Sequence, residues 1–277
     1  MRVRYSFSSR RTRTIDNKND HRVAYPKLAR EVIRISDIIL EVLDARYLEE
    51  TRNIDMEEHV KELGKKLVYV VNKADLVKIS EVKAKLEELN LKPYVLFSCT
   101  RKMGKARLAD LIKIEIKRMK VKFFKAHVGI IGYPNTGKSS LINFLVGRGV
   151  AGRSPERGHT RGIQHVRFNK DILILDTPGV IVESETFAGS DRALQKHAKS
   201  GVRNYDKVKN PDLVVANLMK EHPGKIEKYY RVKAEGDSEI LLDEIGRIYN
   251  FLLKGKVIDI DRSARLVLKA WQEGKIK

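Results

Sequence analysis

The chain has 277 residues, of which 42% are hydrophobic and 33% are charged, and its formal net charge is +20. This composition suits a globular protein with one large core or two domains, and no apolar run approaches the roughly 20 residues that cross a bilayer. The single cysteine, Cys99, excludes a disulfide within the chain, and the basic start "MRVRYSFSSRRTRT" lacks the apolar segment of a signal peptide. We therefore expect a cytoplasmic protein with no membrane and no disulfide-linked partner.

Positive charge is concentrated in two short segments. Residues 1–25 carry a net charge of +5 and residues 101–125 a net charge of +8, so 13 of the 20 excess charges lie there. Clustered cations attract a polyanion through counterion release. The alternative is a solvated face with a basic tail, but charge of this size and clustering favours a nucleic-acid partner.

Apolar runs alternate with amphipathic segments through the first two thirds of the chain. We expect strands over residues 37–45, 66–72, 93–98 and 126–132, followed by a strand pair over 163–169 and 171–176. Helices are expected over 56–65, over 80–89 with Ser80 as N-cap, over 105–119, and from Lys138 onward. This alternation predicts an α/β fold with a mostly parallel sheet and helices on both faces.

The expected helix 105–119 has two different faces. Its apolar positions recur near 3.6-residue spacing at Leu108, Leu111, Ile112, Ile116 and Met119. Lysines 113, 117 and 120 fall on another face, where we expect them to meet solvent or a polyanion.

After Gly179 the pattern predicts helices alone. One helix is expected after Asn210 as N-cap, with Pro211 at its first position and a stop at Pro223–Gly224. Two further helices are marked by apolar stripes, Leu241, Ile245, Ile248 and Leu252 in one and Ala264, Val267, Leu268 and Trp271 in the other. We expect a basic N-terminal extension over residues 1–24, an α/β domain over 25–204 and a small all-helical, RNA-binding domain over 205–277.

The stretch "GYPNTGKSS" (132–140) fits G-x-x-x-x-G-K-[ST] between an apolar strand and a helix, the context that confirms a phosphate loop. Its glycines let backbone N–H groups face phosphates, and the helix N-terminus adds partial positive charge. Lys138 is expected to neutralise the β- and γ-phosphates, and the Ser139 hydroxyl to ligate Mg²⁺. The remaining candidate contacts of this loop are Asn135, Thr136, Gly137 and Ser140.

The stretch "DTPG" (176–179) ends the next apolar strand. Asp176 is placed to hold Mg²⁺ through water, and the Gly179 N–H to meet the γ-phosphate. The polar segment "GRSPERGHTRG" (152–162) lies between these motifs. Thr160 is our candidate to close over Mg²⁺ when the γ-phosphate is present, with His159 and Ser154 as competitors. We assign catalytic contributions to Lys138, Thr160 and Gly179.

The stretch "NKAD" (Asn72, Lys73, Ala74 and Asp75) is predicted to bind a guanine base. Asp75 can accept hydrogen bonds from guanine N1–H and the exocyclic amine, which adenine does not offer in that arrangement. Asn72 can contact N7, and the Lys73 stem can cover the ring. "SCT" (Ser98, Cys99 and Thr100), after the next strand, supplies backbone N–H groups for guanine O6.

An ordinary GTPase has the phosphate loop, the switch and D-x-x-G before N-K-x-D and S-A-x. Here "NKAD" and "SCT" come first. A circular permutation produces this order while it preserves the three-dimensional site, provided that the spatial order of the strands is unchanged. Three strands are expected before the phosphate-loop strand and two after it.

The sequence resembles the circularly permuted GTPases of the YlqF/YawG type over nearly its whole length. The resemblance is carried by the permuted motif order, by "LDAR" (43–46) with "TRN" (51–53), and by the tail "KGKVIDIDRSARLVLKAWQEGKI". It implies a P-loop GTPase that binds GTP/GDP and Mg²⁺, acts in ribosome assembly, mostly of the large subunit, and binds rRNA or a pre-ribosomal particle.

Two departures from the family pattern limit what the resemblance implies. "SCT" has cysteine where alanine is usual. Bacterial members carry a histidine in a "PGH" segment, and His21 in "HRVAYPK" does not match that spacing, so we give it no catalytic role. Relatives with a zinc-binding domain need several cysteines, which this chain does not have.

Two functions from different classes remain open at this point. The first is a GTP-hydrolysing ribosome-assembly factor, and the second is a GTP-gated RNA- or protein-binding module with negligible hydrolysis. Val180 stands where many GTPases have a water-positioning Gln, so intrinsic hydrolysis is expected to be slow. The particle could supply the missing group, or K⁺ beside the phosphates could, with the Asn135 side-chain oxygen as its ligand.

Overall fold

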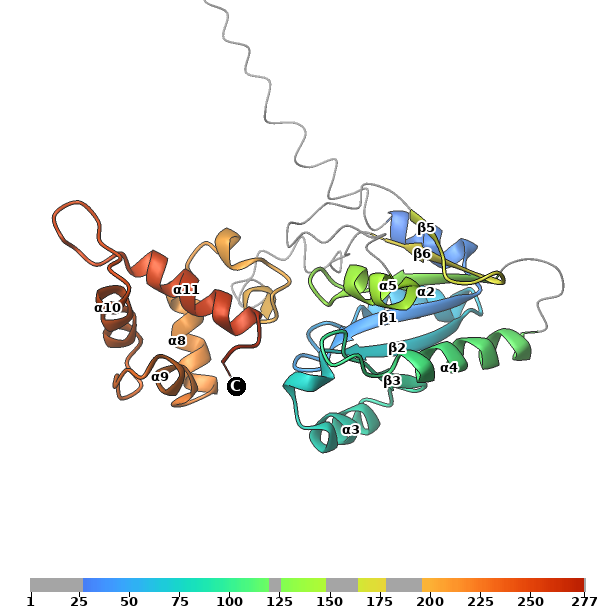
Figure 1. Ribbon diagram of the computed structural model, residues 1–277, viewed down its shortest axis with the longest axis horizontal. Coiled ribbons are helices and arrows are strands. Elements are labelled where there is room, and N and C mark those ends of the chain that lie inside the picture. The colour runs from blue at the N-terminus through green and yellow to red at the C-terminus, as the bar shows by residue number, and fades with distance from the viewer. Residues whose placement is uncertain (1–26, 120–125, 148–163, 178–195, 277) are drawn as a thin grey trace, which may run out of the picture.

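The computed structural model describes residues 27–119, 126–147, 164–177 and 196–276. Its centre is a six-stranded sheet in the order β3-β2-β1-β4-β6-β5 (Figure 1). The strands are β1 (Ile38–Asp44), β2 (Lys66–Asn72), β3 (Tyr94–Leu96), β4 (Ala126–Ile131), β5 (Gln164–Arg167) and β6 (Ile172–Asp176). All neighbouring strands run parallel except β5, which pairs antiparallel with β6. The predicted mostly parallel sheet is confirmed, with three strands before the phosphate-loop strand and two after it.

Helices cover both faces of the sheet because successive side chains of a strand point in opposite directions. Ile38, Leu40 and Val42 of β1 join a cluster with α4 (Lys105–Arg118) and α5 (Lys138–Val146). Ile39, between them, joins a second cluster with α2 (Ile54–Glu62) and a helix over residues 27–35. Leu43 belongs to a third cluster, which contains α3 (Ile79–Glu88).

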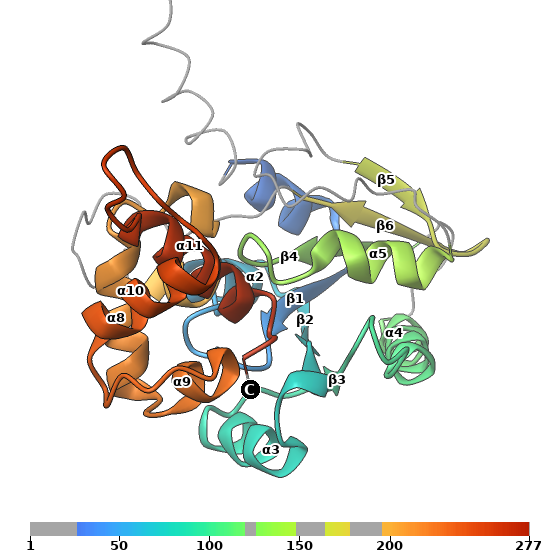
Figure 2. The same ribbon diagram turned by 60° about the vertical axis from the view of Figure 1, so that its left-hand side comes forward.

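The C-terminal part consists of helices packed around their own core (Figure 2). They are α8 (Pro211–Glu221), α9 (Lys225–Tyr230), α10 (Ser238–Ile248) and α11 (Ile260–Gln272). This core also takes in Ala198, ahead of α8, and Ile276, after α11. The predicted stripe on α11 is confirmed, since Ala264, Val267, Leu268 and Trp271 are all buried. The domain boundaries at 24/25 and 204/205 stay predictions.

The structure corrects two local expectations. Ser80 is not an N-cap, because α3 begins one residue earlier at Ile79 with Lys78 in the cap position. The predicted apolar stripe on α10 is confirmed at Leu241 and Ile245, which are buried. It is wrong at Ile248 and Leu252, which are exposed, and α10 ends at Ile248. Leu242 and Gly246 take the buried positions instead, since the α10 backbone packs closely against Ile258. The helix over 27–35 and helix α9 were not predicted.

Asparagine occupies the N-cap position of two helices, one of them predicted. Asn210 occupies the N-cap position of α8 with Pro211 as first helical residue, as predicted, although the Asn210 side chain makes no capping hydrogen bond. Asn53, not predicted, caps α2 by accepting a hydrogen bond from the Met56 amide.

Within the described ranges, no helix combines the length and the apolar character that crossing a membrane requires.

Candidate functional site

The predicted nucleotide contacts gather at the edge of the sheet where the parallel strands end. The phosphate loop (residues 132–140) leaves β4, the base-reading loop (residues 72–75) leaves β2, and "SCT" follows β3. Asp176 is the last residue of β6. Carboxyl ends of parallel strands lie side by side, and this is where ligands bind in open α/β sheets.

Lys138 of the phosphate loop lies inside the loop rather than in solvent. It is buried, and its Nζ donates hydrogen bonds to the carbonyls of Gly132 at 3.0 Å and Tyr133 at 2.7 Å. The Thr136 hydroxyl donates to the same Tyr133 carbonyl at 2.9 Å and so tightens the loop. Burial lowers the pKa of the Lys138 ammonium to about 8, and the nearby Asp176 opposes this shift. Such a buried cation favours an anionic ligand.

The phosphate loop and the base-reading loop are in direct contact. Asn72 Nδ2 donates to the Thr136 carbonyl at 2.9 Å. Gly137 has a φ of +99°, and a Cβ there would lie 2.2 Å from Asn72 Nδ2, so a side chain would separate the loops. Ser139 and Ser140 occupy the first turn of α5, Ser139 half-buried and Ser140 exposed.

Asp176 is buried at the end of β6, next to the phosphate loop. Neither of its carboxylate oxygens has a hydrogen-bond partner within the part of the chain that the structure describes. Burial raises the pKa of Asp176 to about 6, against the opposing effect of the Lys138 charge. A nearby cation would stabilise the charged form of such a buried carboxylate and offset the cost of its desolvation.

Ser139 and Asp176 suit the Mg²⁺ role that the sequence predicts. Mg²⁺ prefers oxygen ligands and is held by one or two protein groups together with substrate phosphates and water. The described residues contain no group of three or more His, Cys, Asp or Glu side chains that could hold a metal by themselves. The orphaned Asp176 carboxylate therefore fits a metal that a nucleotide brings with it.

The base-reading loop is held against the "SCT" segment. Asp75 is half-buried and accepts a hydrogen bond of 2.5 Å from the buried Ser98 hydroxyl, which itself accepts from the Arg101 amide at 3.0 Å. The Ala74 amide donates to the Phe97 carbonyl at 3.1 Å. These contacts hold the Asp75 carboxylate in place beside the "SCT" segment.

A cavity of about 500 Å³ opens beside these loops. Cys99 and Thr100 line it from one side, and Ser140, Asn143 and Phe144 line it from α5. The structure thus brings the "SCT" segment to the start of the helix that follows the phosphate loop, as the predicted site requires.

Sequence reasoning missed two residues at this edge. Asp44 ends β1, is buried, and accepts a hydrogen bond of 2.7 Å from Lys73 Nζ. Arg46 binds the same carboxylate through Nε at 3.0 Å and Nη2 at 2.8 Å. Burial alone would raise the pKa of Asp44, but Lys73 and Arg46 outweigh it and lower that pKa to about 2. The sequence did offer a signal for Asp44: it is an acidic residue at the end of an apolar strand, and that strand was expected to run parallel to the one before "NKAD".

Several predicted residues lie outside the described ranges. These are Thr160 and Gly179 of the catalytic set, the competitors Ser154 and His159, and also His21 and Val180. Their assignments stay predictions.

The fold and the meeting of the two loops define a P-loop GTPase domain with its motifs in circularly permuted order. Residues 127–245 match a family profile described as 50S ribosome-binding GTPase. A solved structure of YlqF from T. maritima bound to GNP superposes with a TM-score of 0.59 at 22% identity, covering 91% of this chain and 94% of that one. This likeness shows a common fold.

Curated relatives place the chain more closely. An uncharacterized GTP-binding protein of Methanocaldococcus jannaschii is 38% identical over 259 residues, 92% of this chain and 66% of that protein. NSN1, a guanine nucleotide-binding protein-like protein of Arabidopsis thaliana, is 33% identical over 93% of this chain and 48% of its own length. Nucleolar GTP-binding protein 2 of Saccharomyces cerevisiae is 31% identical over 89% of this chain and 51% of its own.

These relatives are homologues of the chain, and together with its own motif order they identify it as a circularly permuted GTPase; the likeness to YlqF shows the shared fold. The chain spans just under two thirds of the Methanocaldococcus protein and about half of the two eukaryotic relatives.

Proposed function

We propose that this protein binds GTP, hydrolyses it to GDP and phosphate, and acts in the cytoplasm as a nucleotide-switched assembly factor for the large ribosomal subunit, binding rRNA or a pre-ribosomal particle. The observation that carries the proposal is the contact between Asn72 Nδ2 and the Thr136 carbonyl at 2.9 Å. It joins a loop suited to guanine to a loop suited to phosphates, so one nucleotide spans both.

The proposed roles follow from the chemistry of each side chain. Lys138 would neutralise the β- and γ-phosphates. Ser139 and Asp176 would hold Mg²⁺, which when bound would add to that charge neutralisation, and Thr160 and the Gly179 amide would meet the γ-phosphate side. Because Val180 cannot orient a water by hydrogen bonding, we expect slow intrinsic hydrolysis that rises with the particle and with K⁺ held near Asn135.

The ribosomal part of the proposal is supported by two observations. The matching family profile is described as a 50S ribosome-binding GTPase, and the net charge of +20 suits a polyanionic partner. Lys113 and Lys117 are exposed on α4, on the face turned away from its buried Leu108 and Ile112. They are therefore available to phosphates in the way the sequence predicts.

Co-sedimentation with separated ribosomal subunits tests the partner. With a non-hydrolysable GTP analogue the protein is expected to follow the large subunit, and with GDP to remain in the supernatant. Equal sedimentation with both nucleotides, or with neither, contradicts the nucleotide switch. Replacement of Lys113 and Lys117 by Glu should flatten the slope of log affinity against log salt by about two, one unit for each phosphate contact.

The alternative function is a GTP-gated binding module with negligible hydrolysis. Single-turnover hydrolysis with and without the large subunit separates the two, since only the assembly GTPase should show a rate that the particle stimulates. Removal of residues 205–277 should weaken particle binding more than GTP binding if the helical part carries the specificity.

A further inference from the structure

"LDAR" (43–46) marks the family in sequence, yet the proposed chemistry gives Asp44 and Arg46 no task. The structure connects them to the base-reading loop on one side and to helix α11 on the other. We propose that Asp44 and Arg46 are positioning residues for the guanine nucleotide, which hold Lys73 over the base and make nucleotide affinity depend on the docking of α11.

The first half of the connection runs from Asp44 to the nucleotide site. Lys73 Nζ donates to Asp44 Oδ2 at 2.7 Å and to the Asn135 carbonyl at 3.0 Å. The Lys73 side chain thus bridges the end of β1 and the phosphate loop. Lys73 itself has a φ of +60°, in the left-handed region, so its backbone conformation is uncommon for a lysine. Without the Asp44 carboxylate its long side chain would regain several rotamers.

The second half runs from Asp44 to α11. Arg46 donates two hydrogen bonds to the Asp44 carboxylate, and its other N–H groups face the end of α11. Arg46 Nη1 donates to the Trp271 carbonyl at 3.1 Å, and Nη2 to the Gln272 carbonyl at 3.3 Å. The last carbonyls of a helix carry partial negative charge, which a cation stabilises, and the Trp271 carbonyl accepts the Gly274 amide at 3.0 Å as well. Tyr47, the next residue, accepts a hydrogen bond of 2.5 Å from Trp271 Nε1.

A return path closes these contacts into a ring. The Gln272 side chain donates to the carbonyls of Ala198 at 2.7 Å and Arg203 at 3.0 Å, which fixes the 198–203 segment to α11. Within that segment, the Gly201 carbonyl accepts a hydrogen bond of 2.6 Å from Asn135 Nδ2 of the phosphate loop. The ring therefore passes through the phosphate loop, Lys73, Asp44, Arg46, α11 and the 198–203 segment.

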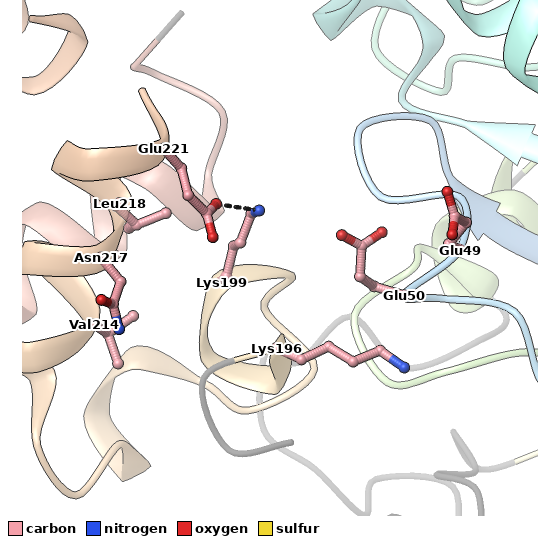
Figure 3. A pocket seen from close by; sticks show the side chains of 8 residues that line it. All are labelled: Glu49, Glu50, Lys196, Lys199, Val214, Asn217, Leu218 and Glu221. Carbon is pink, nitrogen blue, oxygen red and sulfur yellow. Dashed lines mark hydrogen bonds and ion pairs between the residues drawn. The ribbon is translucent and has the colours of Figure 1, made fainter. Parts of the chain in front are cut away.

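The neighbouring contact between the two parts of the molecule is open by comparison. Figure 3 shows Glu49 and Glu50, on the loop after β1, across a cavity from Lys196 and Lys199. The cavity measures about 560 Å³, and Lys199 turns to Glu221 of α8 on its own side. The ring, by contrast, consists of direct hydrogen bonds around buried Asp44. Other contacts also join the two parts, among them Leu76 against Gly274 and Lys199 over the Tyr47 aromatic ring, but the ring of hydrogen bonds is the one that passes through Lys73 and the phosphate loop.

Linkage makes this coupling reciprocal: if docked α11 strengthens nucleotide binding, nucleotide strengthens the docking of α11 by the same factor. The inference rests on the proposed guanine site, because Lys73 matters to affinity through that site. It adds that the affinity of the site depends in part on the contact between Arg46 and Trp271, which are 225 positions apart in sequence.

The test compares Arg46→Met with a matched control, Arg52→Met. Arg52 lies on the same loop and also forms a two-pronged pair, with Glu57 at 2.7 Å for both bonds, but it contacts neither α11 nor the base-reading loop. Titration with fluorescent GDP should show an affinity loss of about 5- to 150-fold for Arg46→Met, the usual range of a coupling between sites. Arg52→Met should stay within about twofold of the wild type.

Hydrogen exchange distinguishes the proposed coupling from a purely structural ion pair, because only the coupling makes amide protection near α11 depend on bound GDP. GDP should increase the protection of backbone amides in residues 198–203 and 272–276 of the wild type and of Arg52→Met, but not of Arg46→Met. If Arg46→Met does not fold, Arg46→Lys and Gln272→Ala take its place. Arg46→Lys keeps the positive charge but loses the two parallel N–H donors. Gln272→Ala removes the hydrogen bonds between α11 and the 198–203 segment, on the side of the ring remote from the nucleotide.

The outcomes separate this inference from the proposed function. If Asp75→Asn binds GTP as the wild type does, the guanine site itself is wrong. If Asp75→Asn weakens GTP while Arg46→Met, or its substitutes, bind GDP as Arg52→Met does, the guanine site stands and the coupling is overturned. Protection by GDP that is equal in all variants also overturns it.

Discussion

The two ends of the nucleotide site are prepared to different degrees. At the base end, Asp75 is held by Ser98, Asn72 by the Thr136 carbonyl, and Lys73 by Asp44. At the metal end, Asp176 is buried with both carboxylate oxygens lacking a hydrogen-bond partner among the described residues. In the proposed site, the base-end side chains are thus already held by protein partners, whereas Asp176 at the metal end is left to pair with a ligand cation. Specificity is therefore expected to be a property of the protein alone, and hydrolysis a property of the assembled complex.

The largest effect is expected at the base end. Asp75→Asn should weaken GTP and strengthen xanthosine triphosphate, because the new amide donates where xanthine offers an acceptor. A site built to hydrogen-bond its ligand rejects a mismatched ligand by about 10⁴-fold, so the ratio of the two affinities should change on that order. Competition titration measures the ratio, and Asp243→Asn in α10 of the helical part is the control. An unchanged ratio would show that "NKAD" is a turn and does not read the base.

The next effect concerns the buried cation at the phosphate end. Lys138→Met keeps the stem and removes the charge that meets the phosphates. Loss of a buried charge partner costs about 2–5 kcal/mol, or roughly 30- to several-thousand-fold in GDP affinity. Calorimetry of wild type, Lys138→Met and a control at the partly exposed Lys85, Lys85→Met, should show this loss in Lys138→Met alone. Similar affinities for all three would place the phosphates elsewhere.

The pH dependence of binding should come from the metal end as well. Asp176, with a pKa raised to about 6, must lose its proton to hold Mg²⁺, and Lys138, with a pKa lowered to about 8, must keep its proton to hold phosphate. Affinity for Mg²⁺–GDP should therefore be flat between about pH 6 and 8 and fall about tenfold per unit on either side. Removal of Mg²⁺ with EDTA should abolish the acid limb and leave the alkaline one. An acid limb that persists in EDTA, or in Asp176→Asn, would assign it to another group.

The same two shifts also contribute to how the stability of the ligand-free protein varies with pH. The folded state binds a proton at Asp176 more tightly than the unfolded chain does, so the free energy of unfolding should fall as pH rises from about 4 to about 6. Lys138 acts in the opposite sense, because its folded pKa lies below its unfolded value. Its contribution should increase stability as pH rises from about 8 to 10.5.

The sequence predicted that the "NKAD" loop, the "SCT" segment and the phosphate loop meet, because their motifs are local and follow apolar strands. Strand alternation also predicted the sheet, since each strand alternates between two buried faces. The ring around Asp44 was not predictable in this way, because Arg46 and Trp271 are 225 positions apart and their contact depends on tertiary packing. The stripe at Ile248 and Leu252 failed for a related reason: the close approach of Ile258 to Gly246 decides which face of α10 is buried.

The smallest effect concerns the monovalent cation. At fixed ionic strength, replacement of Na⁺ by K⁺ should raise the GTP hydrolysis rate about three- to tenfold, which is up to about 1.4 kcal/mol of barrier. The structure complicates the obvious variant, because Asn135 also donates a hydrogen bond to the Gly201 carbonyl, so Asn135→Ala removes a ligand and a link together. Asn135→Asp keeps an oxygen for the cation and loses the donor. Survival of the K⁺ effect in Asn135→Asp with loss in Asn135→Ala would support a ligand role. Loss in both would assign the effect to the Gly201 link, and equal wild-type rates in Na⁺ and K⁺ would leave the particle to complete the site.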